Sequence, residues 1–129
     1  MKLKNKVAIV TGGGKGIGEE ISLGLAKEGA KVVVADLDKE NSSNVVKEIV
    51  KNNGDAIYVE TNVSNEASVK NLISETINRF DQIDILINNA GIRHVKKLEN
   101  HDLSDWNDMI SVNLTGPYIC CQAVIPVMK

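Results

Sequence analysis

Apolar residues follow two patterns along this chain. Short β-branched runs cover residues 7–10, 31–35, 56–63 and 83–87. Few polar side chains interrupt them, so each run predicts a strand that is buried on both faces. Between the runs lie longer stretches in which apolar residues recur every three or four positions, as they do on one side of a helix.

The first helix is predicted from about residue 17 to 28, with Ile17, Ile21 and Leu25 on one face and Gly29 as its end. The second is predicted over about 39–53, with Gly54 as its stop. Its inward positions are Val45, Val46, Ile49 and Val50.

Two further helices complete the pattern. Ser64 is predicted to cap a third helix whose apolar positions are Val69, Leu72, Ile73 and Ile77. The last is predicted over about 103–128, with Trp106, Met109, Ile110 and Leu114 on one side.

Strands alternating with helices at these lengths predict parallel strands joined by right-handed crossovers, a doubly wound α/β sheet. The 129 residues, 43% of them apolar, are enough for one domain with a sizeable core and too few to make two domains the expectation. We therefore predict a single domain over residues 1–129.

Charge and cysteine usage exclude several classes of partner. A net charge of −2 from mixed acidic and basic residues predicts no binding to nucleic acid or to an anionic membrane. The basic N-terminus is followed by an apolar run that ends at Gly12, too short for a signal peptide or a membrane span, so a cytoplasmic location is expected. Cys120 and Cys121 are adjacent and are interpreted as small buried residues. Neither they nor His94 and His101 have metal-ligand spacing, so no metal site is predicted.

The segment Thr11–Gly18, T-G-G-G-K-G-I-G, follows the first predicted strand and opens the first helix. Glycines at this turn let the backbone approach a pyrophosphate, and the helix start attracts its charge. The spacing G-x-G-x-x-G fails because residue 17 is isoleucine, and a triphosphate loop is disfavoured because Lys15 is followed by Gly16. For a glycine cluster alone, the alternative is a tight turn that packs a helix against a strand.

The spacing that fits is T-G-x-x-x-G-x-G, filled by Thr11, Gly12, Gly16 and Gly18, and it resembles the short-chain dehydrogenase/reductase family. The resemblance continues through Asn88-Asn89-Ala90-Gly91 and through Asn113 within Ser-Val-Asn-Leu-Thr-Gly, and it covers essentially the whole chain. It implies a Rossmann-type sheet that is incomplete, with only the first four strands and their flanking helices.

The resemblance also implies roles for these residues. Within the motif that Thr11 opens, Gly12, Gly16 and Gly18 would shape the pyrophosphate loop, and Ile17 would lie near the phosphates. The ribose next to the nicotinamide would be lined by Asn88, Ala90 and Gly91, although an N-N-A-G turn can also simply end a strand. Asn62 and Val63 stand where the family usually has Asp-Val, the acid accepting a hydrogen bond from the adenine amino group. Because Asn can still accept through its side-chain oxygen, adenine binding is expected to be weakened and not lost.

Asp36 ends the second predicted strand about 20 residues after the glycine turn, where a carboxylate can take the hydroxyls of the adenosine ribose. This favours NAD over NADP, because a 2′-phosphate would face like charge. Lys15 and Lys39 argue the other way, since a basic residue beside the turn can pair with that phosphate. The plain alternative for Asp36 is a solvated acid at a strand end.

For catalysis, the resemblance implies hydride transfer between a nicotinamide and an alcohol or ketone carbon. A tyrosine moves the proton, a lysine lowers its pKa, a serine orients the substrate oxygen, and an asparagine holds a water that contacts the lysine. Of these, only the asparagine is present, as Asn113. Neither Tyr58 nor Tyr118 begins Y-x-x-x-K.

Two interpretations follow. The chain is the N-terminal half of an NAD(P)-dependent oxidoreductase, with the catalytic tyrosine expected beyond residue 129, or it is a dinucleotide-binding or interaction module without turnover. In either case we expect no turnover by these residues alone. The family strand order 3-2-1-4 would leave residues 83–87 at a sheet edge and uncover Trp106, Ile110 and Leu114, which predicts self-association.

Overall fold

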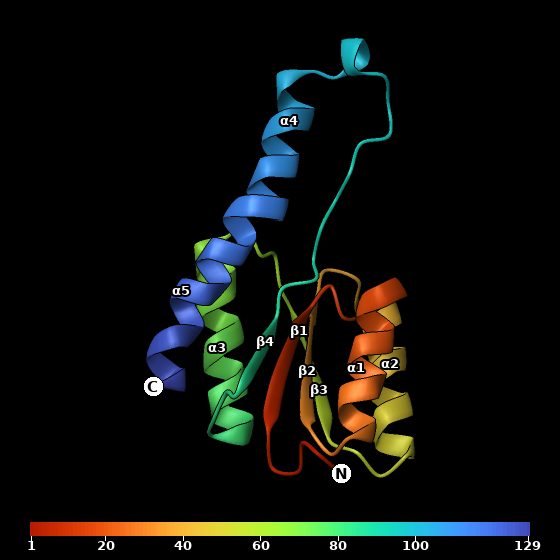
Figure 1. Cartoon of the computed structure of the whole chain (residues 1–129), viewed down its shortest axis with the longest axis vertical. Coiled ribbons are helices and arrows are strands. Elements are labelled where there is room, and N and C mark those ends of the chain that lie inside the picture. Colours follow the sequence, from red (N-terminus) through yellow and green to blue (C-terminus); the bar gives the residue numbers. More distant parts are fainter.

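One parallel sheet runs through the molecule, with its strands in the order β3-β2-β1-β4, as predicted. The computed structural model describes all residues, 1–129. Helices α1 and α2 cover one face of the sheet, and α3 and α5 cover the other (Figure 1). The strands are β1 (Val7–Thr11), β2 (Lys31–Asp36), β3 (Ala56–Glu60) and β4 (Ile85–Ile87). The last two are shorter than predicted, because residues 61–63 and 83–84 lie in the connections beside them.

The core consists of two layers, one on each face of the sheet. Alternate residues of β1 illustrate this, since Val7 and Ile9 pack toward one layer while Ala8 and Val10 pack toward the other. The first layer includes Leu72 of α3 and Val124 of α5, and the second includes Val45 and Ile49 of α2. A strand in the middle of a parallel sheet must be apolar on both sides. This is why its sequence is a continuous apolar run.

The helices agree with the predicted periods, with differences at their ends. They are α1 (Gly16–Lys27), α2 (Lys39–Lys51) and α3 (Glu66–Phe80). The side chain of Asn65 caps α3 by accepting from Ser68 N, so the prediction of Ser64 as the cap was wrong. The left-handed residue after α2 is Asn53 at φ 68°, one position before the predicted Gly54. Val50 is exposed on α2, although it was predicted to face inward.

The last predicted helix is one continuous stretch in three parts, α4 (Leu103–Ile110), the π-helical segment Ser111–Thr115, and α5 (Gly116–Met128). The α5 part packs beside α3, while α4 and the loop before it project past the carboxyl ends of the strands (Figure 1). Short π segments occur frequently at functional sites. This one contains Asn113.

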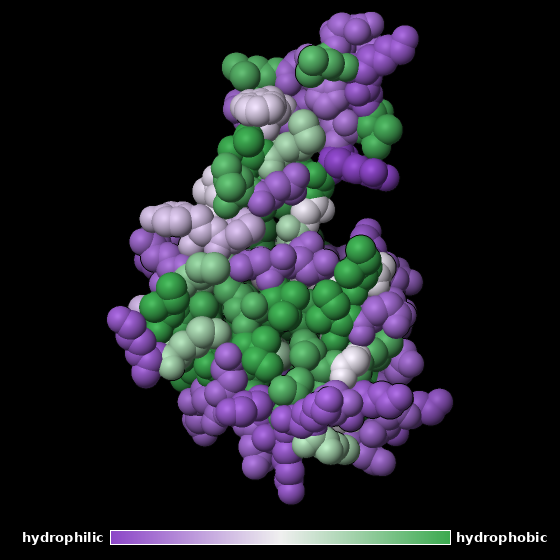
Figure 2. Space-filling view, in the orientation of Figure 1, coloured by the Kyte–Doolittle hydropathy of each residue, from purple (hydrophilic) through white to green (hydrophobic).

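Apolar surface gathers over the middle of the body in Figure 2. On the long helix, Trp106 is 57% and Leu114 is 66% exposed. This helix of 26 residues, Leu103–Met128, is long and apolar enough to cross a membrane by length and composition, a test that core helices of soluble proteins also pass. A helix over these residues was predicted from the sequence, and polar residues of α4 interrupt its apolar ones.

Candidate functional site

A cleft of about 400 Å³ opens at the carboxyl ends of the strands. Segments far apart in the sequence form its walls: the glycine turn after β1, the loop after β2, the loop after β3 and the turn after β4. In open α/β sheets, ligands bind in this crevice. Six predicted site residues line it, namely Gly12, Asp36, Asn62, Val63, Ala90 and Gly91.

Thr11 joins two of these walls and does not line the cleft. It is 1% exposed at the end of β1, and its hydroxyl accepts hydrogen bonds from Asn89 N and Ala90 N, both at 3.0 Å. The Asn89 side chain returns a bond of 3.1 Å to the Gly12 carbonyl. The glycine turn and the N-N-A-G turn are therefore one cross-linked unit.

Within this unit the backbones approach so closely that side chains do not fit. Gly12 has φ 64°, and a Cβ there would lie 2.9 Å from Ala90 Cα. A Cβ on Gly18 would collide with the Gly12 carbonyl. Gly16, by contrast, has nothing within 4 Å of the place where its side chain would be, so the space over the helix start is open.

That helix start has free hydrogen-bond donors. Asp38, Asn65 and Asp102 cap α2, α3 and α4 with side-chain hydrogen bonds, but Lys15 at the start of α1 makes none. The first N–H groups of a helix have no partner inside it, and together with the helix dipole they favour an anion. Ile17, in the first turn of α1, is 75% exposed beside this opening.

Asp36 is half-buried at the end of β2, and both of its carboxylate oxygens have backbone partners. Oδ2 accepts from Gly14 N and Oδ1 accepts from Asp38 N, both at 3.0 Å. A carboxylate oxygen can accept more than one hydrogen bond, so it keeps capacity for a ligand. Lys15 reaches over the same wall and lies 3.9 Å from Asp38. The hydrogen bonds from Asn41 hold the pKa of the Asp38 carboxyl below its usual value.

Asn62 and Val63 form the wall beyond β3. The Asn62 side-chain oxygen accepts from Ser64 N at 3.1 Å and from Ser64 Oγ at 2.6 Å. This oxygen is the atom expected to accept from the adenine amino group, and it is already used by Ser64. The expectation that it remains available as an acceptor is therefore wrong.

Asn113 lies on the long helix and holds the segment that follows β4 against it. Its amide donates to Ile92 O at 2.7 Å and accepts from Ile92 N at 2.8 Å. Asn88 points to the same helix, where its side chain donates to Cys121 Sγ at 3.4 Å. Both side chains thus position the wall between β4 and the helix, and neither lines the cleft.

Neither tyrosine and neither cysteine of the chain lines the cleft. The Tyr58 hydroxyl donates to the Asp36 carbonyl at 3.0 Å, and burial, with the nearby acids Glu60, Asp36 and Asp38, raises its pKa. Tyr118 is exposed on α5 and bonds with Gln122. Burial also raises the pKa of the Cys120 thiol to about 11, as expected for a structural cysteine, whereas Cys121 is only partly buried.

The His94 side chain, in the loop after β4, is only partly exposed. Its ring lies between α4 acids, 4.0 Å from Asp105 and 3.9 Å from Asp108. Lys96 bonds Asp105 at 2.6 Å, which raises the pKa of the lysine and lowers that of the acid. These contacts hold the loop after β4 against α4. No group of three or more potential metal ligands occurs in the chain.

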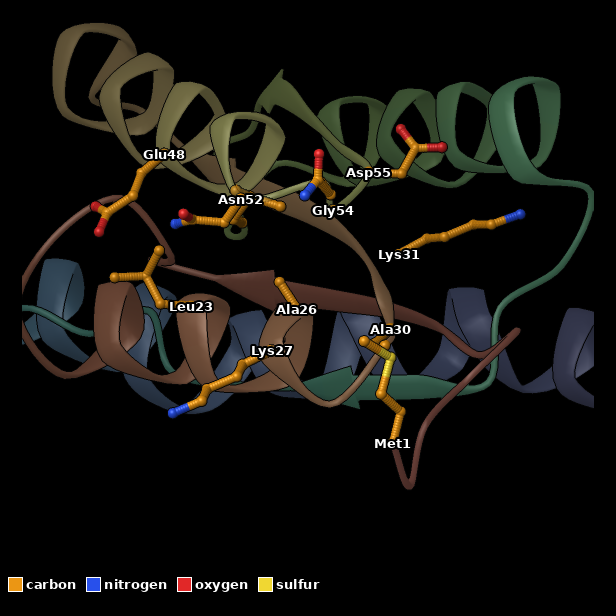
Figure 3. A pocket seen from close by; sticks show the side chains of 13 residues that line it. Met1, Leu23, Ala26, Lys27, Ala30, Lys31, Glu48, Asn52, Gly54 and Asp55 are labelled. Carbon is orange, nitrogen blue, oxygen red and sulfur yellow. The ribbon is translucent and has the colours of Figure 1, made fainter.

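A larger hollow, about 720 Å³, lies at the opposite end of the sheet. Figure 3 shows α1 residues such as Leu23, Ala26 and Lys27 on one side of it. Glu48 of α2 and Asn52, which follows α2, lie on the other side. The C-terminal ends of these two helices border it, and helix C-termini carry partial negative charge. No helix start borders this hollow, in contrast to the cleft.

Some residues of the cleft were not predicted as site residues. Asn89 lies inside a recognised motif, and its side chain is what reaches the glycine turn. Leu37, Asp38, Ile92 and Val112 also line the cleft. Their position beside a strand end was the only signal available for Leu37 and Asp38.

Comparison with known proteins agrees with this architecture. The family profile described as short chain dehydrogenase matches residues 6–129. The chain is 43% identical over 127 residues to a 3-oxoacyl-[acyl-carrier-protein] reductase of Synechocystis, covering 98% of this chain and 51% of that protein. It is 42% identical over 118 residues to an uncharacterized oxidoreductase of Thermotoga maritima, covering 92% and 46%.

Solved structures agree as well. A 3-ketoacyl-(acyl-carrier-protein) reductase from Brucella melitensis, crystallised with NADH, superposes with a TM-score of 0.91 at 38% identity, covering 97% of this chain and 50% of that one. The chain thus spans about half the length of the relatives it matches.

Proposed function

This chain belongs to the short-chain dehydrogenase family, and from that premise we propose that its cleft binds NAD in preference to NADP and forms the cofactor half of an alcohol or ketone oxidoreductase. The observation that carries the proposal is the start of α1, which has no side-chain cap and opens onto free space at Gly16. Hydrogen bonds to the Thr11 hydroxyl join the glycine turn before this helix to the turn after β4. A binding or interaction module without turnover is not favoured, because the matched relatives are oxidoreductases.

The residues fit a dinucleotide in three places. Gly16, Ile17 and Gly18 would hold the pyrophosphate at the start of α1 through free backbone N–H groups. Asp36 would bind the adenosine ribose, and Asn62 with Val63 would border the base. The segment Asn88–Gly91 would lie along the nicotinamide end, where Asn113 keeps it in place.

The preference for NAD follows from the charges around Asp36. A 2′-phosphate would meet the Asp36 and Asp38 carboxylates, which line the same wall. Lys15 could offset this repulsion, but it lies 3.9 Å from Asp38 and is partly neutralised by it. The negative charge at this wall therefore exceeds the positive charge.

Bound NAD would supply hydride acceptance and donation, and the chain's own residues would orient it. The family moves the substrate proton with a tyrosine, and neither tyrosine of this chain lines the cleft or begins Y-x-x-x-K. Asn113 does not substitute, because an amide neither gains nor loses a proton near neutral pH. We therefore propose that these residues alone bind the cofactor without turning over substrate.

The test is a calorimetric titration of the purified chain with NAD and with NADP, followed by an assay with secondary alcohols and ketones at the absorbance of reduced nicotinamide. We expect weak binding of NAD, weaker binding of NADP and no enzyme-like turnover. Equal affinity for both dinucleotides would refute the selectivity of Asp36. Turnover by the wild-type chain that is lost in the Gly16→Asp variant would refute the proposal that these residues bind the cofactor without turning over substrate.

We also propose that the chain self-associates. Ile85–Ile87 is an unpaired edge of the sheet, and the exposed Trp106 and Leu114 lie on the projecting part of the long helix. Exposed edges and apolar patches favour pairing with another chain. Sedimentation velocity at tens of micromolar is expected to show dimers or larger species, and a single monomeric species would contradict this.

A further inference from the structure

The base end of the proposed dinucleotide site has one polar side chain on its β3 wall. Of the three cleft residues in that wall, Val63 is apolar, and Thr61 is buried with its hydroxyl donating to Val59 O at 2.9 Å. The third is Asn62, which is exposed. If Asp36 at the end of β2 binds the ribose, the base extends outward in strand order toward β3, and Asn62 faces its edge.

The orientation of the Asn62 amide follows from its neighbours. A backbone N–H can only donate, so the Asn62 atom 3.1 Å from Ser64 N must be the carbonyl oxygen. The Ser64 hydroxyl donates to the same oxygen at 2.6 Å. The two hydrogen bonds from Ser64 together occupy both lone pairs of the Asn62 oxygen. The Asn62 backbone N–H is held in turn by Ser68 Oγ at 2.9 Å. The free polar group of this residue is its NH₂, a donor.

A donor at this wall changes which purine fits. Adenine carries an amino group at position 6, which is also a donor, whereas hypoxanthine carries a carbonyl there, which is an acceptor. Two donors form no hydrogen bond with each other. We propose that this cleft does not select a 6-amino purine, and that it binds a dinucleotide containing hypoxanthine about as tightly as NAD. The inference rests on the proposed function.

The same geometry explains what an acid would do at this position. A carboxylate at residue 62 has lone pairs left after bonding Ser64, so it would accept from the amino group of adenine and repel the carbonyl of hypoxanthine. The selectivity of the base end is thus set by whether residue 62 offers a donor or an acceptor.

The experiment is a calorimetric titration of the 129-residue chain with NAD and with nicotinamide hypoxanthine dinucleotide. The two ligands share their phosphates, riboses and nicotinamide, so the ratio of their dissociation constants reports on the base alone. We expect the two constants of the wild-type chain to agree within about threefold, and Asn62→Asp to favour NAD by about tenfold or more. Asn44→Asp, which makes the same charge change at an exposed position of α2, should keep the wild-type ratio.

Ser64→Ala provides a second measurement should Asn62→Asp fail to fold. It frees one lone pair of the Asn62 oxygen, so the ratio should move several-fold toward NAD. A wild-type preference for NAD of tenfold or more, or an unchanged ratio in both variants, would overturn the inference while leaving the proposed function intact. Binding of neither dinucleotide would refute the proposed function itself.

Discussion

The two ends of the sheet each carry a hollow, and the smaller one has the features of a binding site. At the carboxyl end, the 400 Å³ cleft is bordered by the uncapped start of α1 and by turns that are hydrogen-bonded to one another across 78 or more residues. At the amino end, the 720 Å³ hollow lies beside the C-terminal ends of α1 and α2. Free backbone donors and cross-linked turns therefore indicate the site better than volume does.

The largest expected effect comes from Gly18→Ala. The added Cβ would collide with the Gly12 carbonyl, so we expect a loss of about 3 kcal/mol in the free energy of unfolding and no dinucleotide binding. Gly24→Ala in the same helix has open space around it and should stabilise the chain by about 0.5–1 kcal/mol. Urea unfolding and calorimetry measure both. Similar effects of the two substitutions would contradict the close approach of the two backbones.

Thr11→Val tests the cross-link between the turns. It leaves two part-buried backbone N–H groups without their acceptor, so we expect a loss of about 2 kcal/mol in unfolding free energy, with weaker NAD binding. Thr76→Val in α3 removes a buried hydroxyl that only donates to a helix carbonyl, and should cost less than about 0.5 kcal/mol. Equal losses in urea unfolding would show that the cross-link contributes nothing beyond an ordinary buried hydroxyl.

Asp36→Asn should weaken NAD binding about tenfold and narrow its advantage over NADP, because the charged acceptor for the ribose is lost. The matched change at the other end of the sheet is Asp55→Asn, which borders the larger hollow and bonds Arg79. Calorimetry should find NAD affinity unchanged in that variant. The comparison between the two ends fails if Asp55→Asn weakens binding as much as Asp36→Asn.

The smallest effect is expected from Tyr58→Phe. The Asp36 carbonyl keeps its bond from Thr61 N, so the loss in unfolding free energy should be about 0.5 kcal/mol. The folded state raises the pKa of Tyr58 above 10.0, which means that it holds the phenol proton more tightly than the unfolded chain does. This tighter proton binding adds to the free energy of unfolding below about pH 10, and its contribution declines as the pH rises through the pKa of Tyr58 in the folded state.

Denaturation at several pH values should show this alkaline decline in the wild type and a smaller one in Tyr58→Phe. Tyr118→Phe on the exposed side of α5 is the control and should behave as the wild type. An identical decline in all three proteins would mean that Tyr58 does not cause it.

Local patterns predicted the strands and the glycine turn, since periodicity and glycine spacing are properties of neighbouring residues. The order of the strands was predicted only from the family resemblance. The contacts that hold the site together involve residues far apart in the chain and were not predictable in this way. Thr11 accepts from a segment 78 residues away, and Asn89 returns a bond to Gly12. Ser64 was expected to cap a helix, but its hydroxyl bonds Asn62 and the cap is Asn65.

The most direct test of the account is a map of backbone amide chemical shifts during titration of the chain with NAD. We expect the largest changes at Gly16–Gly18, Asp36, Asn62 and Asn89–Gly91, all at the carboxyl ends of the strands, with little change at Lys27, Asn52 and Gly54. Changes confined to the residues around the larger hollow, or no changes at millimolar NAD, would contradict the assignment of the cofactor site.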